Sequence, residues 1–567
     1  MNSFQRFIIL LSLLLGHCIS FASAQHFNHK PFQKRVQRVV EKVSPACVKI
    51  SRYDNTGQKR FGTFSGVAIS ADGFVLTAAH ATITGESYLI EFPGGKQYRG
   101  TALARIPAVD AAMIKIDSAG SQLPYCEMGW SYNLKVNQPC LSIAYPGSLS
   151  EIKSPVVRLG YITRLITPEG KMQTSCLMEP GDSGGPVFDL YGRVIGLHSK
   201  IERSLAVNLE NPIDNYRKYW RLLKEQKDYP KDFFPDPEKI GTDLRQQIRQ
   251  EPELTHLPIT FAALIKAHRN TSVGISSKMG SVDLSAWGSV ISLKNNSKDR
   301  YVLSKSSIVA EHPVLITSGL KSLPAVVVKR DPENDLVLLK AEGLDESIVL
   351  DNIKQNVFSK KDEGAFLISP SYMDSVRVGI LGNDSAEIEV LSTPSLGVIC
   401  EDQDSSIVKI TGFRTSVFEK YGLKVNDVID TLNGEQITST RQLNFNIAAM
   451  KPGEEVAIGI KRANERLNIH GLVERAPKTM NKHLADEFEG GMSLRSEGFS
   501  PVFVQDGMVR PEECGGPVFD LNGNFRGINI ARLSRTSTVA LPADVIASFV
   551  LNALEGQSHL TINRNKI

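Results

Sequence analysis

The chain of 567 residues contains one short motif twice, and this internal repeat constrains its fold more than any other feature. The first copy of the motif is Glu179-Pro-Gly-Asp-Ser-Gly-Gly-Pro-Val-Phe-Asp-Leu190. The second copy is Glu513-Cys-Gly-Gly-Pro-Val-Phe-Asp-Leu521, with a cysteine where the first copy has Ser183. Because self-similarity in a sequence indicates repeated structural units, we expect the same fold to occur twice.

Two upstream pairs of segments extend the repeat. Gly66–His80 is matched by Gly288–Ser307, and Ile106–Lys115 is matched by Asp331–Lys340. Within both copies, short apolar runs alternate with Gly, Pro and Asp. Runs of this length and spacing favour an antiparallel barrel or sandwich over alternating helices and strands.

The two copies differ in length. Asp110 lies 73 residues before Ser183, whereas Asp335 lies 179 residues before Cys514. The second copy therefore carries 106 additional residues (179 minus 73), which is enough for a small inserted domain. Signals in that insert are an Asn-Gly hairpin turn at 433–434, a helical stretch at 439–449 and a strand at 455–460.

The N-terminus has the pattern of a targeting segment. Arg6 precedes the apolar run 7–15, and the small residues 22–24 form a cleavage site before Gln25. The apolar run is too short for a membrane anchor, which needs about 20 residues. We therefore expect a signal peptide over 1–24, export to the periplasm or secretion, and no membrane span.

Charge and cysteine content restrict the partners little. The net charge is only +4, and no run of Lys or Arg indicates nucleic acid binding. Six cysteines follow the signal peptide, and an exported compartment permits disulfides, but six thiols allow 15 pairings. Several of these cysteines lie in apolar runs, so buried free thiols are at least as good an interpretation.

His80, Asp110 and Ser183 carry the chemistry that the sequence predicts. A serine hydroxyl is a weak nucleophile, and it needs a base, a group that orients the base, and donors for the oxyanion. The chain order His, Asp, Ser is one of the known orders of such triads. Each residue alone has an ordinary structural explanation, but the three together with these flanks indicate catalysis. The backbone amides of Gly181 and Ser183 are the predicted oxyanion hole.

These motifs resemble those of the HtrA/Do-like branch of the chymotrypsin-like serine proteases. The resemblance implies a mainly β fold: two chymotrypsin-like double β-barrel domains, the second carrying an inserted PDZ-like α+β domain. It also implies unfolded polypeptide substrates, no metal or other cofactor, and a homo-oligomer built on trimers. The expected organisation is an active protease domain (25–220), a charged linker (221–260), a degenerate copy (261–391 with 476–555) and the insert (392–475).

The chain departs from the HtrA-like pattern at two points. HtrA-like proteins usually have one protease unit followed by PDZ domains, and they commonly have Asn before the nucleophile, where this chain has Asp182. The primary specificity pocket of this fold is lined by the residue six positions before the serine, here Leu177. Because Leu177 is uncharged, we expect substrates with small or medium apolar side chains at the cleavage site. The alternative is that Leu177 only packs inside the barrel.

In the second copy, Ser307 replaces the base and Cys514 the nucleophile, while Asp335 remains. A thiol needs a lowered pKa or an adjacent base, and Glu512 and Glu513 oppose thiolate formation. We therefore expect this copy to be inactive.

In the insert, Leu396, Gly397, Val398 and Ile399 resemble the loop by which PDZ domains capture the carboxylate of a C-terminal peptide. The leading interpretation is an exported serine endopeptidase for unfolded or damaged proteins, recruited or regulated by the second copy and the PDZ-like insert. The alternatives are a non-proteolytic PDZ binding protein or holdase, and a processing protease of narrow specificity.

Overall fold

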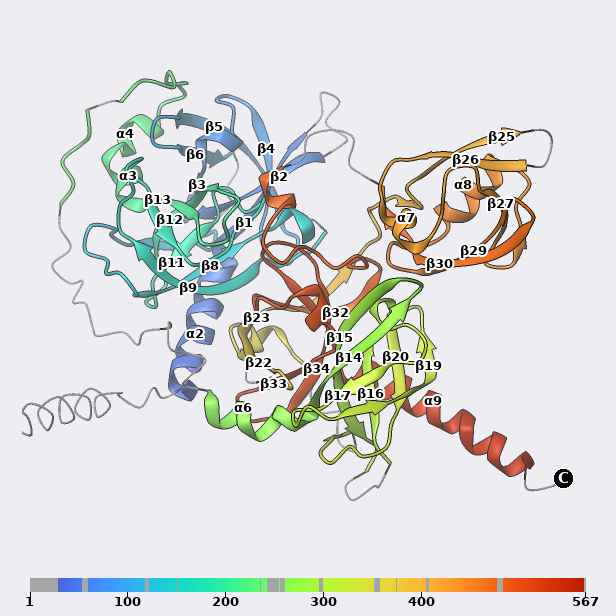
Figure 1. The fold of residues 1–567 in the computed structure, drawn as a ribbon. Helices are drawn as coiled ribbons and strands as arrows, with labels where there is room; N and C mark the ends of the chain where they lie inside the picture. Colours follow the sequence, from blue (N-terminus) through green and yellow to red (C-terminus); the bar gives the residue numbers. More distant parts are fainter. Residues whose placement is uncertain are drawn as a thin grey trace, which may run out of the picture.

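The structure is a computed structural model that describes residues 29–53, 60–117, 122–149, 151–234, 236–241, 254, 261–294, 299–350, 357–373, 375–403, 407–476 and 483–564. The predicted signal peptide and much of the predicted linker lie outside the described residues. Within the described ranges the chain forms two strand-rich units and an inserted α+β unit (Figure 1).

The first unit begins with a closed barrel whose strands follow the order β1-β2-β3-β6-β5-β4. Short strands with alternating burial, as in β5, close into a barrel because one face of each strand points to a common core. That core includes Ile50, Val75, Ile90 and Ile114. The strands are β1 Cys47–Tyr53, β2 Arg60–Ala68, β3 Phe74–Thr77, β4 Ser87–Glu91, β5 Gln97–Ile106 and β6 Ala111–Ile116.

A second sheet of seven strands completes the first unit, in the order β11-β8-β9-β10-β13-β12-β7, and the pairing of β11 with β12 closes it. Its strands are β7 Glu127–Met128, β8 Pro139–Ala144, β9 Val156–Arg164, β10 Met172–Thr174, β11 Pro186–Phe188, β12 Arg193–Ile201 and β13 Asn208–Pro212. Helix α2, His29–Val43, precedes the first barrel, and helices α3, Ile213–Lys218, and α4, Trp220–Leu223, follow the second sheet.

The second unit repeats this plan. Helix α6, Ala262–His268, leads into a sheet with the path β18-β17-β14-β15-β16-β20-β19, to which β21 is added. A closed barrel follows in the order β22-β23-β32-β35-β34-β33, and then helix α9, Ala543–Arg564. The strands of the sheet are β14 Ser272–Met279, β15 Val282–Ser292, β16 Tyr301–Lys305, β17 Val314–Ile316, β18 Ser322–Pro324, β19 Val326–Asp331, β20 Leu336–Lys340 and β21 Ile348–Val349. Those of the barrel are β22 Phe366–Pro370, β23 Val376–Ile388, β32 Phe499–Gln505, β33 Pro517–Asp520, β34 Phe525–Arg532 and β35 Thr538–Pro542.

The insert leaves the second unit after β23 and returns before β32, where the spacing of the repeat predicted additional chain. Its sheet has the order β25-β26-β27-β29-β30, and β24 pairs with β31 where the chain enters and leaves. The strands are β24 Pro394–Ser395, β25 Val398–Gln403, β26 Ile407–Phe413, β27 Val428–Leu432, β28 Glu435–Gln436, β29 Glu455–Arg462, β30 Glu465–Leu472 and β31 Glu474–Arg475. Its helices are α7 Val417–Tyr421 and α8 Thr440–Ala448.

The two strand-rich units share a hydrophobic core. Phe366, Ile368 and Ile380 of the second unit belong to the same buried cluster as helix α2 and much of the first unit. Strand β9 lies against β23, its counterpart in the repeat, as Figure 1 shows near the centre of the molecule. The two units therefore pack directly against each other and are not separate domains joined only by a linker.

Asp506 joins the two units at this junction. Its carboxylate accepts hydrogen bonds from the Leu159 amide of the first unit (2.9 Å) and the Ile380 amide of the second (2.7 Å). Burial raises the pKa of Asp506 to about 6 from its ordinary 3.8, although both amides and the charge of Arg158 oppose the shift. A folded-state pKa above the unfolded one adds stability that is fully present below about pH 4 and is lost as the pH rises through about 6.

Replacing Asp506 with Asn removes this titration. We expect the wild type to gain melting temperature relative to Asp506→Asn when the pH falls from 7 to 4.5, because only the wild-type side chain takes up a proton. Two pKa units correspond to at most about 3 kcal/mol. Differential scanning calorimetry of both proteins measures the difference, and an equal gap in melting temperature at both pH values would contradict the assignment.

Candidate active site

His80, Asp110 and Ser183 lie together between the two barrels of the first unit. His80 is in a short 3-10 turn, Ala79–Ala81, directly after β3, and Asp110 directly precedes β6. His80 Nε2 is 2.9 Å from Ser183 Oγ, and His80 Nδ1 is 3.0 Å from Asp110 Oδ1. The adjacent strands β3 and β6 bring together two side chains that are 30 residues apart. Ser183 can therefore pass its proton to His80 while Asp110 holds the ring.

Two further contacts hold the Asp110 carboxylate. The backbone amide of His80 donates to Oδ1 (3.0 Å), and the Ser199 hydroxyl donates to Oδ2 (2.5 Å). Asp110 has a φ of 57°, in the left-handed region that non-glycine residues rarely adopt. Sequence reasoning missed Ser199, because it lies within β12 and is 89 residues away from Asp110 along the chain.

The pair has shifted pKa values of opposite sign. Burial tends to lower the pKa of His80, but the hydrogen bond and the charge of Asp110 raise it above 6.5 overall. Burial tends to raise the pKa of Asp110, but His80, Lys171 and Ser199 lower it overall. Asp110 thus remains ionised, and His80 is a stronger base than a free imidazole.

The turn before Ser183 has the arrangement of a type II turn. The Asp182 amide donates to the Glu179 carbonyl (3.0 Å), with Pro180 and Gly181 at the central positions and Gly181 at φ 100°. A Cβ at Gly181 would lie 2.5 Å from the Gly147 amide nitrogen, so only glycine fits.

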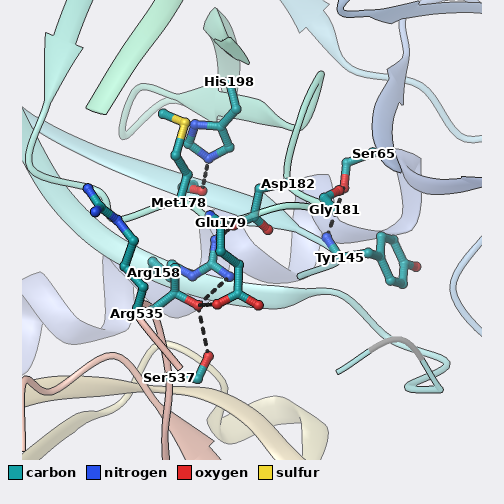
Figure 2. Close-up of polar contacts among 12 residues, drawn as sticks. Ser65, Tyr145, Arg158, Met178, Glu179, Gly181, Asp182, His198, Arg535 and Ser537 are labelled. Carbon is teal, nitrogen blue, oxygen red and sulfur yellow. Dashed lines mark hydrogen bonds and ion pairs between the residues drawn. The ribbon is translucent and has the colours of Figure 1, made fainter. Parts of the chain in front are cut away.

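The Gly181 carbonyl is held from outside the turn. It accepts from the Ser65 hydroxyl (2.8 Å), which accepts in turn from the Tyr145 amide (2.9 Å), as Figure 2 shows. In the described part of the chain, neither the Gly181 nor the Ser183 amide donates to a protein acceptor. These are the two donors that the sequence predicted for an oxyanion.

A buried ion pair holds Asp182. Arg158 Nη1 lies 2.8 Å from Asp182 Oδ2, and the two side chains are 1% and 0% exposed. The same oxygen accepts from the Glu179 amide (2.9 Å) at the start of the turn. Burial raises the pKa of Asp182, and the charge of Arg158 opposes that shift.

Leu177 is half-buried and lines a cavity of about 280 Å³ between the two units. Phe366 and Met508 of the second unit line the same cavity. Leu177 therefore lies at the junction with the second unit, in the segment that precedes Ser183. Its predicted part in selecting apolar substrate side chains remains a prediction.

The matching positions of the second unit have different chemistry. Ser307 donates to Asp335 through both its amide (2.7 Å) and its hydroxyl (2.9 Å). The buried Lys305 ammonium lies 2.5 Å from the same carboxylate. Asp335, with a φ of 55°, keeps the backbone conformation of Asp110. Its carboxylate is occupied by a cation and a hydroxyl, where that of Asp110 holds an imidazole.

Cys514 is fully buried, and burial raises its pKa above the usual thiol value. Its sulfur lies 3.7 Å from the Ser493 hydroxyl and 3.7 Å from the Arg510 carbonyl, and within the described ranges no hydrogen bond links it to a histidine. The residues before it, Pro511–Glu513, form a 3-10 turn in place of the turn that precedes Ser183. The pKa of the Cys514 thiol is thus not lowered, and the turn before Cys514 differs from the turn before Ser183.

The insert presents the loop that the sequence singled out at the end of an edge strand. Leu396 is buried, Gly397 has a φ of 66°, and Val398 begins β25, whose described partner is β26 alone. The Gly397 amide donates to the Ser395 hydroxyl (2.9 Å), while Ile399 is 41% exposed. Helix α8 packs beside β25 and buries Leu443 and Ile447.

The described residues offer neither a metal site nor a membrane-spanning helix. No group of three or more His, Cys, Asp or Glu side chains in these ranges is arranged to hold a metal ion. None of the helices there combines the length and apolar character needed to cross a membrane. The six cysteines are free thiols, and all but Cys400 are buried.

Comparison with known proteins supports two domain assignments. The model of a trypsin-like peptidase domain matches residues 64–197, and the model of a PDZ domain matches residues 394–471. A probable periplasmic serine endoprotease DegP-like of Pseudomonas fluorescens is 32% identical over 157 residues, which are 26% of this chain and 32% of that protein. A putative serine protease HhoA of Synechocystis is 29% identical over 164 residues, which are 27% of this chain and 41% of that protein.

The chain thus spans less than half the length of these relatives. It carries a trypsin-like peptidase domain and a PDZ domain, and it is similar to DegP and HtrA serine endoproteases, as its motifs predicted. The mainly β fold with chymotrypsin-like double barrels and an inserted PDZ domain is likewise confirmed.

Proposed function

We propose that the protein is an exported serine endopeptidase that cleaves unfolded or damaged polypeptides through His80, Asp110 and Ser183. The observation that carries the proposal is the continuous hydrogen-bond chain from Ser183 Oγ through the His80 ring to Asp110. Oriented nucleophile, base and carboxylate at these distances are the arrangement that acyl transfer to a serine needs. The names of the relatives, periplasmic serine endoproteases, support both the reaction and the compartment.

The proposed reaction uses the three side chains and the two amides in turn. Ser183 Oγ attacks the carbonyl carbon of the scissile bond while its proton moves to His80 Nε2. The Gly181 and Ser183 amides receive the negative oxygen, and such donors contribute about 10²–10³-fold each. His80 then protonates the leaving amine, the peptide bond breaks, and an acyl-Ser183 ester remains. Water, deprotonated by His80, hydrolyses that ester and restores the serine.

The second unit is proposed to be catalytically inactive. Its nucleophile position holds a buried thiol with a raised pKa, and its base position holds a serine. Lys305 pairs with Asp335, and among the described residues the hydrogen-bond partners of the Cys514 sulfur include the Ser493 hydroxyl and the Arg510 carbonyl, neither of which is a base of the His80 kind. This unit is proposed to act in recruitment or regulation.

The PDZ domain is proposed to bind C-terminal peptides of substrates. Edge strand β25 can accept an added strand, and the backbone of residues 396–399 can receive the terminal carboxylate. For the Gly397 amide to take part, it must exchange its bond to the Ser395 hydroxyl for one to the peptide.

Matched alanine variants in the two units test the assignment. We expect purified protein from residue 25 to degrade unfolded casein, Ser183→Ala to lose at least about 10³-fold in rate, and Cys514→Ala to keep the wild-type rate. The measurement is the release of labelled casein fragments over time. Equal losses in both variants would contradict a single working site.

The same assay addresses the other functions. Protection of casein from aggregation without cleavage, in the wild type as in Ser183→Ala, would indicate a holdase instead of a protease. Covalent labelling by a fluorophosphonate without casein cleavage would indicate a processing enzyme of narrow specificity.

The pH dependence of cleavage tests the role of Asp110. Because catalysis needs neutral His80, and Asp110 raises the pKa of His80, we expect the acidic limb of kcat/KM above pH 6.5 in the wild type. In Asp110→Asn the burial of the ring remains and its anionic partner is lost, so the limb moves to lower pH while kcat falls by roughly 10⁴-fold. An unmoved limb in Asp110→Asn would contradict this role.

A further inference from the structure

A charged pair buried as deeply as Arg158 and Asp182 carries a large desolvation penalty. The cost of removing two charges from water is several kcal/mol per ion, and replacement by apolar residues is often neutral or stabilising. Stability is therefore a weak reason for this pair. Its position offers a better one, since Asp182 lies between the two predicted oxyanion donors, Gly181 and Ser183.

The pair fixes the turn at both ends. Asp182 Oδ2 accepts a hydrogen bond from the Glu179 amide, which links the last residue of the turn to the first. The same oxygen accepts from Arg158, which links the turn to strand β9. Loss of the Asp182 contacts would free the turn at this end. The peptide group after Asp182 carries the Ser183 amide, and Gly181 lies inside the turn that the contact between Asp182 and the Glu179 amide closes.

The second unit reaches the same network through the loop between β34 and β35. Thr536 Oγ1 donates to Glu179 Oε2 (2.9 Å) and accepts from Arg158 Nη2 (3.3 Å). In Figure 2, Arg158 and Glu179 lie between the Asp182 turn and this loop, which is marked by Ser537. The other Glu179 oxygen accepts from the Ser148 amide (2.9 Å). Glu179 is thus held from both units.

Arg535 of the same loop binds a second segment of the first unit. Its guanidinium donates to the carbonyls of Glu202 (2.8 Å) and Ser204 (2.9 Å), in the segment between β12 and β13. The side chain is buried, and its three nearest carbonyl partners all belong to the first unit. That segment follows Ser199, which holds Asp110.

The internal repeat provides a comparison within the chain. Arg158 pairs with Ser142 across β8 and β9, and Arg377 pairs with Ser369 across β22 and β23, so the two arginines occupy the same register. Arg377 binds Glu513, the residue that precedes Cys514, at 2.5 Å. The arrangement of an arginine with the acid before the nucleophile position thus occurs twice. In the second unit the pair is more exposed, at 27% and 8%.

We propose that Arg158 is a positioning residue for the oxyanion turn, and that Thr536 and Arg535 of the second unit complete it, so that Ser183 reaches full activity only with the second unit docked. The inference rests on the proposed serine endopeptidase function. It gives the inactive unit a specific task, which is to hold the nucleophile loop of the active one.

The test compares kcat, KM and the rate of fluorophosphonate labelling of Ser183 in full-length variants. We expect Arg158→Met to lose about 10²-fold or more in kcat with KM changed less than about threefold, because transition-state donors and not substrate contacts are misplaced. Asp182→Asn combined with Arg158→Met removes both charges, and we expect it to recover at least about tenfold over Arg158→Met. Thr536→Val is expected to lower kcat by about tenfold and to leave KM unchanged.

Arg377→Met is the matched control, since it breaks the equivalent pair in the second unit and is expected to keep kcat within about twofold. If Arg158→Met does not fold, Arg158→Lys serves instead, because a point charge keeps one contact but loses the fork that also reaches Thr536. Wild-type kcat in Arg158→Lys and in Thr536→Val would overturn the inference. So would equal losses in Arg158→Met and Arg377→Met. A wild type that neither cleaves casein nor labels would refute the proposed function itself.

Discussion

The proposed reaction needs the Gly181 and Ser183 amides to point at one position beside Ser183, and contacts from both units hold the turn that carries these amides. A turn with glycine at φ 100° supplies the shape, and a carboxylate bound to a buried arginine holds the turn in place. Arg158 comes from β9, the strand that packs on its counterpart β23 in the second unit. The junction between the repeats and the turn before Ser183 therefore share one hydrogen-bond network.

The repeat shows how one scaffold holds two kinds of chemistry. In both units an aspartate with a left-handed backbone conformation accepts a hydrogen bond from a backbone amide just after the third strand. Asp110 accepts from the His80 amide, and Asp335 accepts from the Ser307 amide. In the first unit this carboxylate then orients His80, whereas in the second it neutralises Lys305. The second unit also packs on the PDZ domain, through Met279, Val282 and Leu284. It thus contacts both the PDZ domain and the turn before Ser183 in the first unit, and it has Ser307 where the first unit has His80.

Local sequence patterns predicted much of this structure, but the contacts between residues far apart in the sequence could not be predicted from them. The repeat and the position of the insert follow from short motifs and their spacing, and the structure brings the predicted residues His80, Asp110 and Ser183 within hydrogen-bond distance. Arg158 was missed because it lies in an apolar strand, and its partners Asp182 and Thr536 lie 24 and 378 residues away. The buried Lys305 was missed for the same reason. A signal for Arg158 exists in the repeat itself, since Arg-Leu-Gly at 158–160 recurs as Arg-Val-Gly at 377–379.

The central claim is that Ser183 is the one working nucleophile and that the turn before it binds the oxyanion. A crystal structure of the protein after reaction with a fluorophosphonate tests both parts at once. The account predicts a phosphonyl group on Ser183 Oγ, its oxygen within hydrogen-bond distance of the Gly181 and Ser183 amides, and an unmodified Cys514. An adduct on Cys514, or a phosphonyl oxygen turned away from both amides, would contradict it.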